Sequence, residues 1–116
     1  MKKILLLALL LSPQLFADDT ALLEDKCGSC HATSSHTIGK ISEMKAPPMW
    51  GMMKMVNKRY SNHEEAKDYI RGFVFEPHEK NMIFPHASIE RFGLMPSQKG
   101  KITTEELERV LKVLYP

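Results

Sequence analysis

The sequence predicts an all-helical fold, and three patterns support this prediction. Apolar residues recur at helical spacing in several segments, capping-box patterns precede two of these segments, and no segment alternates apolar and polar residues as a half-buried strand would. The 116 residues, 43% hydrophobic and 26% charged, have the composition of one globular domain. This composition excludes a disordered tail, a collagen-like repeat, a disulfide-dense scaffold and a multidomain enzyme.

The first seventeen residues have the three-part layout of a secretory signal peptide. A basic start and an apolar run, Ile4 to Leu11, precede the small residue Ala17. The run is shorter than the ~20 residues that a membrane-spanning helix needs. We expect residues 1–17 to be removed and residues 18–116 to form the mature domain; a buried N-terminal helix is the alternative. Loss of two lysines would bring the formal charge from +2 to zero, and no basic block indicates nucleic acid.

The expected helices begin just after this segment. Residues 18–20 cap a helix that runs through about residue 27, and their acidic side chains favour its start. Residues 32–48 are rich in Ser, Thr, Gly and Pro and are predicted to form a loop. A short helix over about 49–59 follows.

Capping-box patterns open two further helices. The pattern at residues 61–64 begins a helix that ends near Phe75, before Pro77, and the pattern at 103–106 begins the C-terminal helix. Between these helices, prolines break residues 76–98, with room for a short helix near 88–92. An irregular stretch of this length is unusual in a small domain, so we expect it to wrap around a ligand.

Both cysteines lie in one short motif, Cys27-Gly28-Ser29-Cys30-His31. This spacing is shared by redox-active dithiols, by half of a zinc site and by covalent haem attachment. A structural disulfide is a fourth interpretation, although a loop this small stabilises a fold only slightly. Haem attachment alone also uses the adjacent histidine, because two thiols one turn apart can bond one haem edge while the imidazole lies under the iron.

The rest of the chain favours haem attachment. A dithiol oxidoreductase would place the pair between a strand and a helix, and no strand pattern is present. A zinc site would need two more ligands at comparable spacing, and the remaining histidines are scattered. The export segment agrees with haem, because c-type attachment is completed outside the cytoplasm. We therefore expect one haem c, covalently bound through Cys27 and Cys30.

With this motif and this helical pattern, the chain resembles the class I monohaem c-type cytochromes, from the motif to the C-terminal helix. The resemblance implies a small helical fold around one haem, in which the first and last helices cross and His31 is an axial ligand. In that family the second axial ligand is a methionine in a loop before the final helix, and Met95, in Gly-Leu-Met-Pro, matches it. The alternatives are His86 and His78, which would give a bis-His haem of lower potential.

The resemblance also implies two supporting residues. An axial histidine usually donates its other ring N–H to a backbone carbonyl, which in the family belongs to a proline. Pro47 is the better match for that proline and Pro48 the second. Trp50, the only tryptophan, has two open interpretations: an indole N–H donor to a haem propionate, or a core aromatic residue.

These expectations together predict an exported electron carrier of the periplasm rather than an enzyme. Two strong axial ligands favour electron transfer over substrate activation, and no acid–base or nucleophile cluster accompanies the motif. Its partners would be redox proteins that dock transiently: an oxidase, a reductase or a membrane cytochrome complex. The alternatives are a haem-bearing accessory subunit of a periplasmic redox enzyme, a bis-His or open-site haem protein, a haem-based sensor and a dithiol oxidoreductase.

Overall fold

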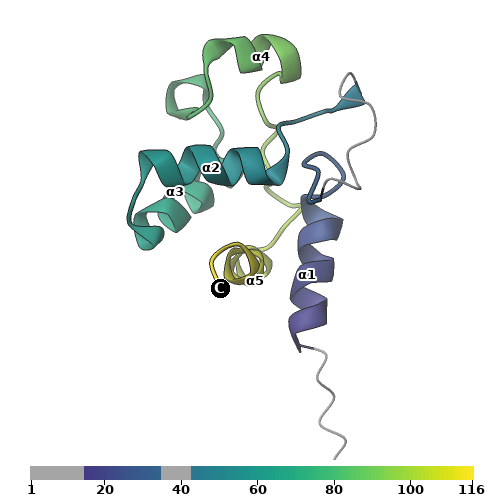
Figure 1. Cartoon of the computed structure of the whole chain (residues 1–116). Helices are drawn as coiled ribbons and strands as arrows, with labels where there is room; N and C mark the ends of the chain where they lie inside the picture. The colour runs from purple at the N-terminus through teal and green to yellow at the C-terminus, as the bar shows by residue number, and fades with distance from the viewer. Residues whose placement is uncertain (1–14, 35–42) are drawn as a thin grey trace, which may run out of the picture.

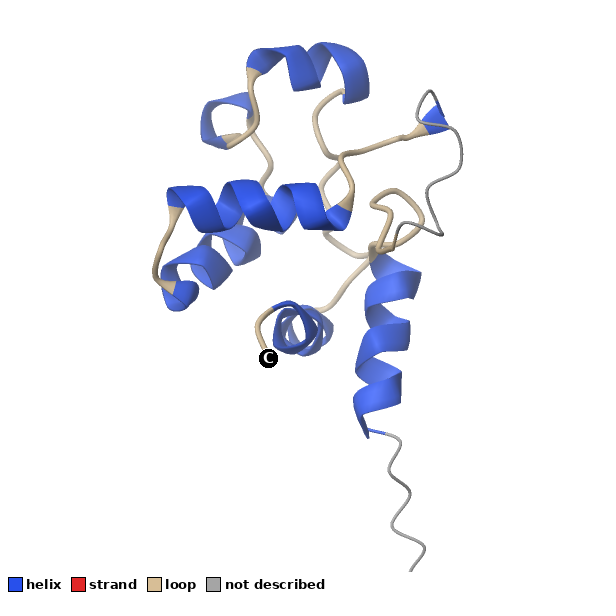
Figure 2. Ribbon diagram, in the orientation of Figure 1, coloured by secondary structure: helices blue, strands red, loops and turns tan. Residues whose placement is uncertain are grey.

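The computed structural model describes residues 15–34 and 43–116, which form helices and loops without a strand (Figures 1 and 2). The elements are α1 (Leu15–Lys26), α2 (Met49–Arg59), α3 (His63–Phe75), the 3₁₀ turn η3 (Glu79–Asn81), α4 (His86–Phe92) and α5 (Thr104–Leu114). The all-α prediction is therefore confirmed for the described residues. The expected signal segment lies almost wholly outside them. Among the described helices, none has both the length and the apolar character needed to cross a bilayer.

The first and last helices pack against each other and hold the main core. In Figure 1, α5 points towards the viewer beside the upright α1, so the two helices cross steeply. The buried cluster combines side chains from α1, α2 and α5 with one from the loop before α5: Leu23, Met49, Ile102, Leu107, Val110 and Leu111. An ion pair between Asp19 and Arg109, 2.6 Å apart, also joins α1 to α5. The expected crossing of these helices is present.

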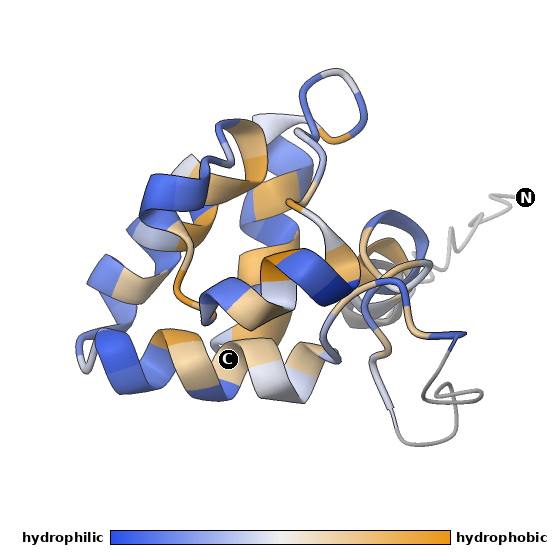
Figure 3. Cartoon of the chain, turned by 90° about the horizontal axis from the view of Figure 1, so that it is seen from above, coloured by the Kyte–Doolittle hydropathy of each residue, from blue (hydrophilic) through white to orange (hydrophobic). Residues whose placement is uncertain are grey.

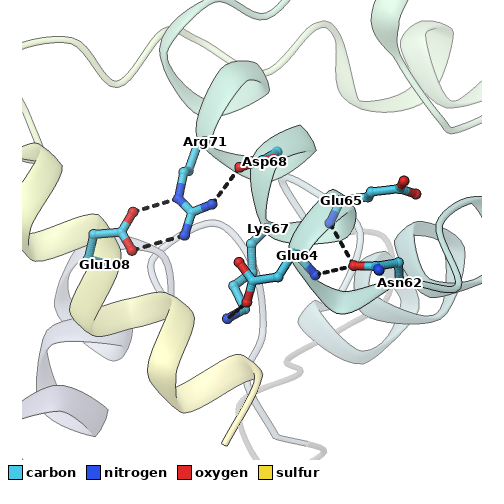
Figure 4. Close-up of polar contacts among 7 residues, drawn as sticks. All are labelled: Asn62, Glu64, Glu65, Lys67, Asp68, Arg71 and Glu108. Atoms are coloured by element: carbon cyan, nitrogen blue, oxygen red, sulfur yellow. Dashed lines mark hydrogen bonds and ion pairs between the residues drawn. The ribbon is translucent and has the colours of Figure 1, made fainter.

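A second link joins α3 to α5. The Arg71 guanidinium on α3 donates to both carboxylate oxygens of Glu108 on α5, at 2.6 and 3.1 Å, and to Asp68 at 2.6 Å (Figure 4). Viewed from above in Figure 3, apolar segments of the helices turn towards the interior and polar segments face outwards. The hydrogen bonds between Arg71 and Glu108 fix α3 relative to the α1–α5 core.

The starts of α3 and α1 differ from the prediction. The side chain of Asn62, rather than Ser61, caps α3, because Asn62 Oδ1 accepts hydrogen bonds from the amides of Glu64 and Glu65 (Figure 4). Asparagine is at least as good an N-cap as serine, which accounts for the shift of one residue. Helix α1 begins at Leu15, three residues before the expected cap, since no Gly or Pro interrupts the sequence from there to Lys26.

The other helices lie at or close to their predicted positions. Helix α2 has the expected bounds, and α4 occupies the place foreseen for a short helix, two residues earlier. At α5 the capping box is formed: Thr103 Oγ1 accepts from the Glu106 amide at 3.1 Å, and the Glu106 carboxylate accepts from the Thr103 amide at 3.0 Å. The turn η3 was not foreseen.

Candidate cofactor site

A cavity of about 450 Å³ lies among the end of α1, the helices α2, α3 and α4, and the loop before α5. Most of its wall is apolar, and its volume lies within the range of cofactor sites, about 300–1,000 Å³. Five of the six residues singled out in the sequence line it: Cys27, Cys30, His31, Pro47 and Met95. Because these residues come from three separate segments of the chain, their convergence is a property of the fold.

The Cys27–His31 motif forms a tight turn directly after α1. The Cys27 amide donates to Leu23 O and the His31 amide to Cys27 O, each at 2.9 Å, so the last turn of α1 leads straight into the motif. A Cβ at Gly28 would lie 2.6 Å from Glu24 O. Only glycine fits there, because the turn lies directly against the backbone of α1.

The His31 imidazole is buried and held by one hydrogen bond. The residue is 7% exposed, and Nδ1 donates to Pro47 O over 2.7 Å. The hydrogen bond expected with Pro47 is therefore present. Burial lowers the pKa of His31, partly opposed by this hydrogen bond, so the ring is neutral at pH 7. With Nδ1–H engaged, Nε2 keeps the lone pair that a metal ligand needs.

Cys27 and Cys30 are free thiols, and the surroundings of Cys27 do not favour a thiolate. Burial, and after it the neighbouring Cys30, raises the pKa of Cys27. Cys27 also directly follows the C-terminal end of α1, where the helix dipole is negative and disfavours a thiolate. A redox-active dithiol needs a lowered thiol pKa, so these surroundings count against that interpretation.

The loop that carries Met95 is fastened to the end of α3. Ser97 Oγ donates to Phe75 O at 2.7 Å, and the Gln98 amide donates to Val74 O at 2.9 Å. These carbonyls belong to the last turn of α3 and have no partner within the helix. Gly93, with φ of +76°, ends α4 and starts the loop. The backbone just after Met95 is thus held against α3, and Met95 itself is partly buried at the cavity wall.

The alternative ligands do not all reach this cavity. Among the histidines of the described residues, only His31 lines it, and His78 and His86 are exposed. Two further thioethers, Met52 and Met82, do line the cavity. Met52 lies on α2, and Met82 lies in the irregular stretch after α3; neither was singled out in the sequence, because neither has a local pattern of its own.

Trp50 is the one predicted site residue that the structure does not bring to the cavity. It lies in the first turn of α2 with 45% of its surface exposed, and it is not among the lining residues. It is not a core residue either, so neither interpretation of Trp50 gains support. A zinc site also lacks support, because residues 15–34 and 43–116 hold no group of three or more His, Cys, Asp or Glu that could bind a metal ion.

Much of the remaining wall is apolar, as suits a flat, apolar cofactor. Val56, Phe73 and Val74 come from α2 and α3, and Phe84 and Phe92 come from the proline-rich stretch. That stretch does wrap the cavity, as its irregular sequence indicates. The donors present are an imidazole, thioethers and thiols, which are known ligands and attachment points for a c-type haem. The residues present therefore fit that cofactor.

Comparison of the chain with protein-family models, with curated proteins and with solved structures finds no match.

Proposed function

We propose that this chain is an exported electron-transfer protein that carries one electron on a haem attached to Cys27 and Cys30. His31 and Met95 serve as its axial ligands. Such a haem supplies an Fe(III)/Fe(II) couple, and the residues of the chain tether, ligate and shield it. The periplasm is the proposed location, and larger redox proteins are the proposed partners.

The observation that carries the proposal is that one apolar cavity collects the whole ligand set. His31 is neutral, buried and oriented by Pro47 O at 2.7 Å. Met95 lines the same cavity on a loop that α3 holds in place. Two protein ligands, His31 and Met95, would keep the coordination of a bound haem the same in both oxidation states, so that little reorganisation would accompany electron transfer.

An enzymatic role is less well supported by the same cavity. Such a role requires a sixth position that opens, whereas the Met95 loop is fixed through both Ser97 and Gln98. A bis-His carrier would need His78 or His86 in the cavity, and both lie outside it. Met52 and Met82 are the ligands that compete most directly with Met95.

The experiment is the ferric absorption spectrum of the protein exported in a host with c-type haem maturation. We expect haem that stays bound after denaturation in acidified solvent, and a weak far-red charge-transfer band from methionine sulfur. Met95→Ala should abolish this band. Met55→Ala is the matched control, because Met55 is a partly buried methionine of α2 outside the cavity lining, and it should leave the band intact.

Two results would contradict the proposal in different ways. Absence of covalent haem would refute haem attachment itself. Covalent haem with a band that survives Met95→Ala but disappears in Met52→Ala or Met82→Ala would move the axial ligand to that residue.

A further inference from the structure

Helix α2 has an exposed face that takes no part in lining the cavity. Trp50, Lys54 and Lys58 follow one another at intervals of four residues, so their side chains lie along one side of the helix. All three are exposed, and 45% of the Trp50 surface is open to solvent. Met49 and Val56 are the buried residues of the same helix. The helix therefore packs with one side and leaves a tryptophan and two lysines on the other.

The charge of α2 distinguishes it from the other described helices. Of the helices α1 to α5, α2 alone has no acidic side chain, and it carries three basic ones. The third, Arg59, ends the helix with its guanidinium 5.3 Å from the Tyr60 ring centre. No ion pair in the described part of the chain involves Lys54 or Lys58. Their ammonium groups therefore give this face a positive potential, which attracts an anionic surface.

We propose that this face of α2, formed by Trp50, Lys54 and Lys58, binds the surface of an anionic lipid bilayer. The two ammonium groups pair with lipid phosphates, because the flexible lysine stem lets the charge reach the headgroups. The Trp50 indole suits the boundary between headgroups and acyl chains, where its apolar ring and its N–H donor are both satisfied. This binding is peripheral and does not require a haem.

The residue types of the face favour lipid over an acidic protein. Lysine is depleted in protein–protein interfaces, whereas each lysine near an anionic bilayer adds to the attraction. A tryptophan that anchors a protein interface is usually enclosed in a well-packed pocket. Trp50 lies instead on the exposed outside of a helix, and it lines neither the main cavity nor the smaller hollow formed by Pro47, Pro48 and their neighbours.

Binding through this face has a consequence for electron transfer. Met52 and Val56, on the other side of α2, line the cavity. The bound bilayer therefore lies about one helix diameter, 10–12 Å, from the cavity. Only this consequence rests on the proposed function, since it places a haem near a redox partner embedded in the same membrane.

The test measures sedimentation of the purified exported chain with vesicles of phosphatidylcholine that contain phosphatidylglycerol, and with vesicles of phosphatidylcholine alone. We expect binding to the first kind only, and weaker binding when salt is added. Lys54→Gln/Lys58→Gln should lower the affinity about fivefold for each lysine. Lys80→Gln/Lys112→Gln is the matched control, because both lysines are exposed and lie on other elements, and it should bind nearly as well as the wild type. All variants share one N-terminus, so differences between them come from the substituted positions.

Trp50 gives a second readout, because it is the only tryptophan of the chain. Its emission should shift to shorter wavelength with the vesicles that contain phosphatidylglycerol and stay unchanged with phosphatidylcholine alone. Trp50→Ser should weaken sedimentation with the anionic vesicles. Trp50→Phe, which keeps an aromatic ring, should weaken it less.

Three results would overturn the proposal. One is equal sedimentation with the two kinds of vesicle, including none with either, and another is an equal loss of affinity in the two lysine pairs. The third is soluble poly-glutamate that binds as tightly as the anionic vesicles and depends on Lys54 and Lys58 in the same way, which would assign the face to an acidic protein. A chain without covalent haem would refute the proposed function but leave vesicle binding intact, so the two failures are distinguishable.

Discussion

Gly28 is tightly constrained by the surrounding backbone. A Cβ at this position would lie 2.6 Å from Glu24 O, which is too close for any real contact, and the neighbouring atoms belong to the last turn of α1. We expect Gly28→Ala to shift the turn that carries the cysteines, to destabilise the fold by about 1–3 kcal/mol and to reduce haem loading. Denaturant unfolding and the ratio of haem to protein measure both effects.

Gly72 provides the matched control for this substitution. It lies inside α3, and a Cβ added there would meet no atom within 4 Å. Gly72→Ala should therefore raise stability by about 0.5–1 kcal/mol, because glycine is a poor helix residue, and should leave haem loading unchanged. Equal effects of the two alanines would show that the close approach at Gly28 does not constrain the motif.

At the same scale, sequence patterns selected residues that line the cavity where one residue is defined by its neighbours. His31 follows two cysteines, and Met95 lies in a Gly/Pro loop before a capped helix, so short patterns were sufficient to select both. Trp50 and Met82 had no such pattern. Whether a side chain at those positions faces the cavity or solvent depends on packing between distant segments, which local sequence does not encode.

At the scale of elements, the cap of α5 supports the core. Thr103 accepts from the Glu106 amide at 3.1 Å, and α5 supplies three buried residues to the main cluster. Thr103→Ala should lower the free energy of unfolding by about 1 kcal/mol. Thr104→Ala, one residue later and also exposed, removes no cap and should change little. Thermal or urea unfolding measures the stability of both variants. Equal losses of stability in the two variants would count against a capping role for Thr103.

The contact between α3 and α5 predicts a pH dependence. Hydrogen bonds from Arg71 lower the pKa of Glu108 below its ordinary value, so the ionised carboxylate stabilises the folded chain above about pH 4.5. This contribution is lost as the pH falls through the lowered pKa. Because both side chains are about a third exposed or more, it is worth only about 0.5–1 kcal/mol.

Urea unfolding at several pH values measures this contribution. Glu108→Gln should be less stable than the wild type at pH 7, and the difference should vanish in acid. Glu90→Gln, which removes an exposed carboxylate from α4, is the charge-matched control and should show no such convergence. A difference that persists in acid would show that Glu108 acts through packing rather than charge.

Element boundaries show why helices are easier to foresee than their connections. The apolar spacing of α5 and its capping box were sufficient to place it, because both depend on residues a few positions apart. The turn η3 depends instead on a side-chain contact, in which Asn81 Oδ1 accepts from the His78 amide at 2.9 Å. Ile102, buried with 6% exposure, was missed because it lies in the loop before a helix, outside any apolar period.

At the scale of the whole molecule, the core and the cavity share a wall. Ile102 and Leu107 belong to the main buried cluster and also line the cavity of about 450 Å³. A cofactor that fills this space therefore completes the packing of the core. Without one, apolar side chains from α2, α3 and α5 meet water, and the hydrophobic contribution of that surface to stability is lost.

This shared wall predicts that covalent attachment determines the stability of the entire chain. The variant Cys27→Ser/Cys30→Ser keeps His31 and Met95 but cannot form thioether bonds. We expect it to lack haem after denaturing extraction, to melt at least ~10 °C lower, which corresponds to about 2 kcal/mol, and to bind a hydrophobic dye. Ser29→Ala, exposed between the two cysteines, is the control and should resemble the wild type. The contrary result would be a haem-free double variant that melts at the same temperature as the wild type and binds no dye. In that case the apolar wall of the cavity would be shielded from water without a cofactor, and the cavity would close by itself.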